Sequence, residues 1–341
     1  MRARLFSMQT GSWRIDHSLL SSDGNHNAPL SRALRRGKKN ILSGENMHYA
    51  AGSKTIRVHD ETNDINFETW LLYPSTDQSQ DIKIGPYSIR ACQDGKIAGG
   101  KFPLVVISHG GGGSHLLYRV VAQHLAQNGY VVAMPEHHGN NRNNNSLEGQ
   151  NKNLSLRTWH IRLVIDTLLS DPELMEHIDS QQIFMIGHSM GGCTALAIAG
   201  AVPWSREREQ IEVSNDGRVK ALVLFAPAAA WFQHPDALNH VKLPIEVFSA
   251  EHDTLTPYWQ ADLIKHNIKN PALVNVITVK NAGHLSFLAP FPENMRSKNF
   301  PPSQDPDGFD RQAFHETLKV EVLDFFNKQL ENKAIAEEKK S

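Results

Sequence analysis

The chain has 341 residues, enough for one large domain or two ordinary ones, and its 40% hydrophobic and 21% charged residues are typical of a soluble globular protein. No stretch approaches the ~20 consecutive apolar residues of a membrane-spanning helix, so stable membrane insertion is not expected. The 35 basic and 36 acidic side chains nearly cancel, which gives no reason to expect nucleic acid as a partner. Two cysteines are too few for a disulfide scaffold or a four-cysteine zinc site.

The charge is concentrated at the N-terminus. Residues 1–40 hold eight basic side chains against two acidic ones, without the apolar run of a secretory signal. We therefore predict a basic, disordered segment over residues 1–50 and a cytoplasmic location, with an organelle-targeting peptide as the alternative. A single folded domain is expected over residues 51–330, followed by a polar tail over residues 331–341. The sequence leaves the oligomeric state open.

The first predicted elements are strands. Lys54–His59 and Phe67–Tyr73 alternate between apolar and polar residues, like an opening hairpin with one exposed face. Further along, short β-branched or apolar runs predict buried strands. These runs are Leu104–Ser108, Tyr130–Met134, Ile183–Gly187, Ala221–Phe225, Ile245–Ser249 and Val274–Val279.

Segments of helical period separate these strands. We predict helices over His115–Asn128, Leu156–Leu169 and Cys193–Ala201, and a final helix whose apolar face runs from Phe314 to Phe325. Strands that alternate with helices in this way predict an α/β domain, with a mostly parallel central sheet covered by helices on both faces.

A glycine-rich turn follows one of the buried strands. The residues Gly187-His188-Ser189-Met190-Gly191 match the pattern G-x-S-x-G, and a helix of small residues comes next. This is the setting of a nucleophile elbow, where a serine lies on a strained turn from strand to helix. Neighbours without Cβ let the turn close, and the helix N-terminus places partial positive charge beside the serine. Ser189 is therefore the predicted nucleophile, with an ordinary glycine-rich turn as the alternative.

A nucleophilic serine needs a histidine base, and the base needs a carboxylate that orients it. On a sheet of this kind the acid and then the histidine follow the serine along the chain. Glu251 and Asp253 follow one predicted strand, and His284 follows the next. Because the carboxyl ends of parallel strands meet at one edge, we expect Asp253 and His284 to reach Ser189, with Glu251 as the competing acid.

Four consecutive glycines, Gly110–Gly113, follow the strand Leu104–Ser108. A phosphate-binding loop is a poor match, because both the Gly-Lys-Ser/Thr ending and the G-x-G-x-x-G spacing are absent. An oxyanion hole fits better, since acyl transfer places negative charge on a carbonyl oxygen and each preset N–H donor contributes ~3 kcal/mol. We expect the amides of Met190 and Gly111 to be these donors, with a flexible linker as the alternative.

With these motifs in place, the chain resembles the α/β-hydrolase family over roughly residues 54–330. The segments Phe102–Gly110 and Gly129–Asn140 make it most similar to the dienelactone-hydrolase-like and platelet-activating-factor-acetylhydrolase-like branch. Animal acetylhydrolases of this type carry their acid after the preceding strand. Here Ala226–Ala230 offers no carboxylate, so the acid is expected from Asp253. Dienelactone hydrolases use a cysteine nucleophile, whereas this chain has a serine at that position.

The chain has 18 histidines, and Glu136-His137-His138 raises the question of a metal site. The zinc-protease motif H-E-x-x-H is absent, so we expect no metal and no other cofactor, and histidines that lie in a loop near the mouth of the site. Trp231, Phe232 and Leu285 are candidates for an apolar substrate-binding surface, with ordinary packing as the alternative.

The sequence predicts a serine hydrolase that cleaves small-molecule carboxylic esters through a Ser-His-Asp triad and an acyl-enzyme intermediate. Seven asparagines between Asn140 and Asn153 predict a polar lid over the site, which favours short-chain or moderately polar esters over long triglycerides. Cleavage of thioesters, lactones or amides by the same triad is the nearest alternative. A binding protein on a hydrolase fold is the alternative from another class.

Overall fold

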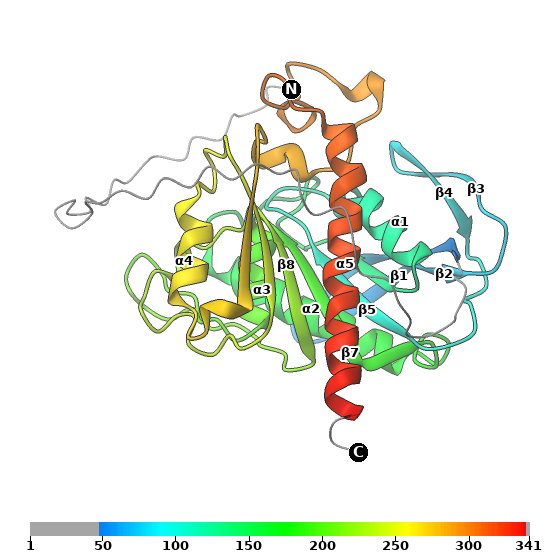
Figure 1. The fold of residues 1–341 in the computed structure, drawn as a ribbon, viewed down its shortest axis with the longest axis horizontal. Coiled ribbons are helices and arrows are strands. Elements are labelled where there is room, and N and C mark those ends of the chain that lie inside the picture. Colours follow the sequence, from blue (N-terminus) through cyan, green and yellow to red (C-terminus); the bar gives the residue numbers. More distant parts are fainter. Residues whose placement is uncertain (1–47, 339–341) are drawn as a thin grey trace, which may run out of the picture. The chain divides into compact units, whose positions relative to one another are not determined.

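The computed structural model describes residues 48–338 of the chain (Figure 1). It therefore leaves most of the predicted N-terminal segment, residues 1–47, outside the described residues. The described chain opens with an antiparallel hairpin of β1 (Ala50–Asp60) and β2 (Ile65–Ser75), in the place where alternation predicts it.

The described strands form one sheet of ten, in the order β10-β9-β8-β7-β5-β6-β2-β1-β4-β3. From β10 to β6 all neighbours are parallel, whereas β2 pairs antiparallel with β6 and with β1. The sheet is thus mostly parallel, as expected. The remaining strands are β3 (Gln80–Ile84), β4 (Tyr87–Gln93), β5 (Phe102–Ser108), β6 (Val131–Pro135), β7 (Ile178–His188), β8 (Val219–Phe225), β9 (Ile245–Ala250) and β10 (Val274–Val279).

Helices cover both faces of this sheet, and the alternation of side chains along β5 shows why. Leu104 and Val106 belong to the core that also holds buried side chains of α2, α3 and α4, whereas Val105 and Ile107 belong to the core formed with α1 and α5. Successive strand residues point to opposite faces, so a strand buried on both is apolar throughout. The helices are α1 (Arg119–Gln127), α2 (Asn151–Ser170), α3 (Met190–Ile198), α4 (Trp259–Asn267) and α5 (Arg311–Glu338).

Several elements differ from the sequence prediction. The hairpin of β3 and β4 was not predicted, although its residues alternate on either side of a Gly85-Pro86 turn. β10 forms where expected but is not buried throughout, because it lies at the sheet edge and exposes Asn275 and Thr278. The final helix continues to Glu338, so the described part of the predicted polar tail, residues 331–338, is helical; its Glu, Lys and Ala residues favour helix.

Within residues 48–338, no helix combines the length and the apolar character needed to cross a membrane.

Candidate active site

The candidate site is built from loops that follow neighbouring parallel strands. β5 and β7 pair in parallel with Ser108 opposite Gly187, so the four-glycine loop and the serine turn leave the sheet side by side. Asp253 follows β9, and His284 follows β10. The strand order therefore brings all the predicted catalytic segments to the carboxyl edge of one sheet.

Ser189 lies on a sharp turn between β7 and α3. Its backbone has φ 54° and ψ −116°, which is a strained conformation for a residue with a side chain. The neighbouring glycines make the turn possible. A Cβ on Gly187 would lie 2.3 Å from the Gly191 carbonyl oxygen, and one on Gly191 would lie 1.9 Å from the Ser108 carbonyl oxygen. The turn thus has the geometry of a nucleophile elbow.

The four-glycine loop passes directly beside this turn. A Cβ on Gly110 would lie 3.5 Å from Cβ of Ser189, and a Cβ on Gly111 would lie 3.7 Å from Cβ of Met190. Among the described residues, neither the Gly111 amide nor the Met190 amide has a hydrogen-bond acceptor. Both predicted oxyanion donors are therefore available on adjacent segments.

His284 and Asp253 are in direct contact. His284 Nδ1 lies 2.8 Å from Asp253 Oδ2, and both side chains are buried. The competing acid lies elsewhere, since the Glu251 carboxylate binds Lys280 Nζ at 3.0 Å and the Asn281 amide at 2.9 Å. The structure therefore brings Asp253, rather than Glu251, to the histidine.

Thr256 contacts both members of this pair, and it is not among the site residues predicted from the sequence. Its amide and the Leu255 amide each donate to Asp253 Oδ1 at 2.8 Å. Its hydroxyl lies 2.8 Å from Asp253 Oδ2 and 3.1 Å from His284 Nδ1. An aspartate whose side chain accepts from the amides two and three residues later forms a common type of turn. The spacing Asp-x-x-Thr in the sequence therefore indicates such a turn at Asp253.

These contacts fix the charge of the acid. Burial alone would raise the pKa of Asp253, but the hydrogen bonds from His284 and Thr256 outweigh it and hold the pKa below its usual value. Asp253 is therefore ionised at neutral pH and can fix His284 with its proton on Nδ1. That tautomer leaves Nε2 free to act as a base.

A second chain of hydrogen bonds joins the glycine loop to the backbone of His284. The Gly110 amide donates to the Tyr118 hydroxyl oxygen at 3.2 Å, and that hydroxyl lies 2.9 Å from His188 Nδ1. His188 Nε2 lies 3.1 Å from the His284 carbonyl oxygen, which can only accept. His188 therefore carries its proton on Nε2 and accepts from Tyr118 at Nδ1. Burial lowers the pKa of His188 to about 3, which keeps this ring neutral.

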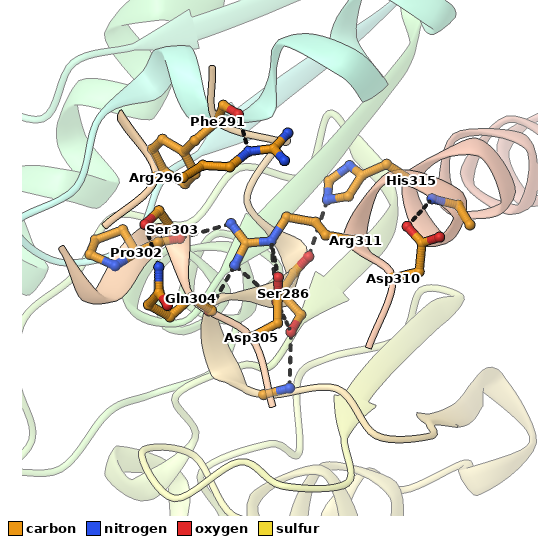
Figure 2. A network of polar contacts seen from close by, with 12 residues as sticks. Ser286, Phe291, Arg296, Pro302, Ser303, Gln304, Asp305, Asp310, Arg311 and His315 are labelled. Carbon is orange, nitrogen blue, oxygen red and sulfur yellow. Dashed lines mark hydrogen bonds and ion pairs between the residues drawn. The ribbon is translucent and has the colours of Figure 1, made fainter. Parts of the chain in front are cut away.

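Beyond His284, a polar network holds the following loop against α5 (Figure 2). The Ser286 hydroxyl accepts from the Gly283 amide at 3.0 Å and donates to Asp305 Oδ1 at 2.7 Å. Arg311, at the start of α5, binds the same carboxylate through Nε and Nη2 at 2.9 Å each. His315 Nε2, one turn later, donates to the Ser286 carbonyl oxygen at 3.1 Å. The segment that carries His284 is thus held against α5 through both the hydroxyl and the carbonyl oxygen of Ser286.

The three predicted substrate-contacting residues have different environments. Phe232 is fully buried and packs in the hydrophobic core, whereas Trp231 and Leu285 are partly buried at the edges of the two cores. Large exposed apolar side chains lie instead on the segment after Asp253: Leu255, Tyr258 and Trp259. These three residues are not among the predicted substrate-contacting residues, and in the sequence they stand out only as apolar residues beside the predicted acid.

His137 was expected near the mouth of the site, but the structure buries it. Its Nε2 lies 2.8 Å from Ser108 Oγ, and its amide donates to His109 Nε2 at 3.0 Å. In the part of the chain that the structure describes, no three His, Cys, Asp or Glu side chains are grouped as metal ligands would be.

The asparagine-rich segment packs on the four-glycine loop. Asn141 forms an isolated bridge with Gly113, and the Arg142 amide donates to the Gly113 carbonyl oxygen at 2.8 Å. A Cβ on Gly112 would lie 3.2 Å from the Asn145 side chain. Both the backbone and an asparagine side chain of this segment therefore contact the glycine loop.

The comparisons with known proteins agree with this architecture. The family model of the alpha/beta hydrolase fold matches residues 103–243, while no curated protein matches the chain. A ferulic acid esterase from Streptomyces cinnamoneus aligns with a TM-score of 0.65 at 18% identity, over 84% of this chain and 92% of that one. A dienelactone hydrolase from Anabaena variabilis ATCC 29413 aligns at 16% identity over 80% of this chain and 97% of that one, with a TM-score of 0.48.

The chain therefore has the α/β-hydrolase fold, and the fold expected from its sequence motifs is confirmed.

Proposed function

We propose that the protein is a serine hydrolase that cleaves carboxylic esters, with Ser189, His284 and Asp253 as its triad. The observation that carries this proposal is the buried contact of 2.8 Å between His284 and an ionised Asp253, at the same sheet edge as a strained serine turn. A serine turn alone occurs in many proteins. When a carboxylate–histidine pair also lies at the neighbouring strand ends, the arrangement is the one that activates a serine nucleophile.

In the first half of the reaction, Ser189 Oγ bonds to the acyl carbon while His284 Nε2 takes its proton, and the carbonyl electron pair moves onto oxygen. The amides of Gly111 and Met190 stabilise this oxyanion. The C–O bond to the alcohol then breaks, and His284 returns the proton to the leaving oxygen. Water deprotonated by His284 attacks the acyl-enzyme, and Ser189 is released with its proton restored.

We further propose short-chain or moderately polar esters as substrates. The segment Asn140–Asn153 packs on the glycine loop with asparagine side chains, and it offers no apolar stripe for a long acyl chain. An ester that reaches the Gly111 amide would pass these side chains.

A fluorophosphonate probe tests the chemistry, because it phosphonylates only an activated serine. Wild type should be labelled at Ser189, and Ser189→Ala should not be labelled. Well-folded wild type that takes up no probe would refute the proposal. Hydrolysis of p-nitrophenyl esters with acyl chains of increasing length then tests the substrate class. Activity should be highest for short acyl chains. A maximum at long acyl chains would contradict the proposed preference for short-chain or moderately polar esters.

A further inference from the structure

Arg157 lies in the interior behind the four-glycine loop. It projects from α2, is 1% exposed, and binds the backbone at the start of that loop. Its Nη1 donates to the His109 carbonyl oxygen at 2.8 Å and lies 3.4 Å from Ser108 Oγ. Its Nε donates to Asn140 Oδ1 at 3.0 Å.

The partners of Arg157 are all neutral. No carboxylate of the described residues forms an ion pair with it, and its Nη2 has no hydrogen-bond partner among them. His109 and His137 lie nearby and are uncharged, because burial holds the pKa of each well below the usual value. Burial lowers the pKa of Arg157 itself to about 9, so the guanidinium is charged at neutral pH.

An unpaired charge in a protein interior costs free energy, and proteins retain such groups mainly where function uses them. Negative charge does develop close to Arg157 during the proposed reaction. Gly110 and Gly111 follow directly on the His109 carbonyl that Arg157 holds, and the Gly111 amide is one of the two oxyanion donors proposed above. In a dry interior a fixed positive charge acts with little screening.

We propose that Arg157 is a positioning residue of the oxyanion hole: it holds the His109 carbonyl so that the Gly111 amide stays beside the Met190 amide, and its uncompensated charge favours the anionic intermediate over the neutral ester. This inference rests on the proposed function. It predicts that Arg157 contributes to binding of the tetrahedral state and little to binding of the substrate.

Phenylboronic acid is a suitable probe, because it forms an anionic tetrahedral adduct with a nucleophilic serine. We expect Arg157→Gln to lower kcat and boronate affinity by about 10- to 100-fold, somewhat less than loss of a direct oxyanion donor, and to change KM by less than about 3-fold. Arg157→Lys keeps the positive charge but lacks the several N–H donors of the guanidinium group. Its kcat and boronate affinity should lie between those of wild type and those of Arg157→Gln. Arg162→Gln removes a positive charge from the same helix and should match wild type in all three constants.

Thermal unfolding and circular dichroism of each variant separate these effects from loss of structure. If Arg157→Gln does not fold, Arg157→Lys carries the test. A folded variant at position 157 that binds boronate as tightly as wild type would overturn the inference. That result differs from failure of the proposed function, in which wild type itself would take up neither boronate nor fluorophosphonate.

Discussion

Ser189 combines the proposed chemistry with an unfavourable backbone conformation. Its positive φ costs about 1–3 kcal/mol for a residue with a Cβ, and glycine adopts it without that cost. The turn is closely packed, because a Cβ on Gly187 or on Gly191 would clash with a backbone carbonyl oxygen.

Ser189→Gly should therefore unfold at a higher temperature than Ser189→Ala, by the equivalent of about 1 kcal/mol after the extra chain entropy of glycine is subtracted. Both variants should be inactive, so the comparison isolates backbone strain from chemistry. Differential scanning calorimetry of the two variants measures it. Equal or reversed melting temperatures would mean that the turn is not strained.

The acid of the triad can be tested against its neighbour. Asp253→Asn should lower kcat by about 10²- to 10⁴-fold, because an amide does not hold His284 in the tautomer that leaves Nε2 basic. Glu251→Gln is the matched control and should keep wild-type turnover, since that carboxylate binds Lys280 on the surface. The reverse pattern in steady-state kinetics would move the acid to Glu251.

At the scale of elements, the position of His284 depends on the contacts that hold its loop against α5 and against the nucleophile motif. His284 lies on a segment tied to α5 by Ser286, Asp305 and Arg311, and its carbonyl is tied to His188 in the nucleophile motif. A network of this kind limits how far the base can move from the nucleophile, and small displacements of a catalytic group are costly in rate.

Asp305→Asn should weaken the Arg311 pair and the contact with Ser286, and lower kcat by roughly tenfold through a less well placed His284. Asp310→Asn is the control on the same segment, because Asp310 caps α5 through the Ala313 amide and does not touch the His284 loop. The rate of fluorophosphonate labelling checks the effect without dependence on product release. If Asp305→Asn labels as fast as Asp310→Asn, the network has no positioning role.

At the scale of the whole molecule, burial keeps several histidines in the described interior neutral. Burial lowers the pKa of His188 to about 3 and those of His115, His160 and His315 to about 4, and it holds those of His109 and His137 well below the usual value. In the unfolded chain each of these groups would titrate near pH 6.5. Between these pH values the unfolded state binds protons that the folded state does not.

The free energy of unfolding should therefore fall as pH drops below about 6.5, by about 1.4 kcal/mol per pH unit for each such histidine. Six of them would exhaust a stability of about 5–15 kcal/mol within roughly two pH units, so acid unfolding is expected near pH 5. Calorimetry in buffers of different ionisation enthalpy should detect about five protons taken up on unfolding at that pH.

His315→Gln should reduce this proton uptake by about one, because burial lowers the pKa of His315 to about 4. A melting temperature that stays constant from pH 8 to pH 5 would show that the buried histidines are already protonated in the folded protein.

The sequence determined the features that depend on neighbouring residues. The strand-turn-helix around Ser189, the four-glycine loop and the alternation of strands with helices follow from local sterics and periodicity, and the structure has all three. The order of Asp253 and His284 along the chain likewise places both after strands that end at one sheet edge. The β3–β4 hairpin also follows a local pattern, the alternation on either side of Gly85-Pro86, but it is absent from the predicted strands.

Only the tertiary structure decided the contacts between distant residues. Tyr118 reaches His188 across 70 positions, Arg157 reaches His109 across 48, and Asp305 reaches the His284 loop from beyond the last strand. The choice of Asp253 over Glu251 as partner of His284 is of the same kind, since the two carboxylates are two residues apart and only side-chain direction separates them. Such contacts depend on strand order and packing, and these properties belong to the whole chain rather than to any one segment.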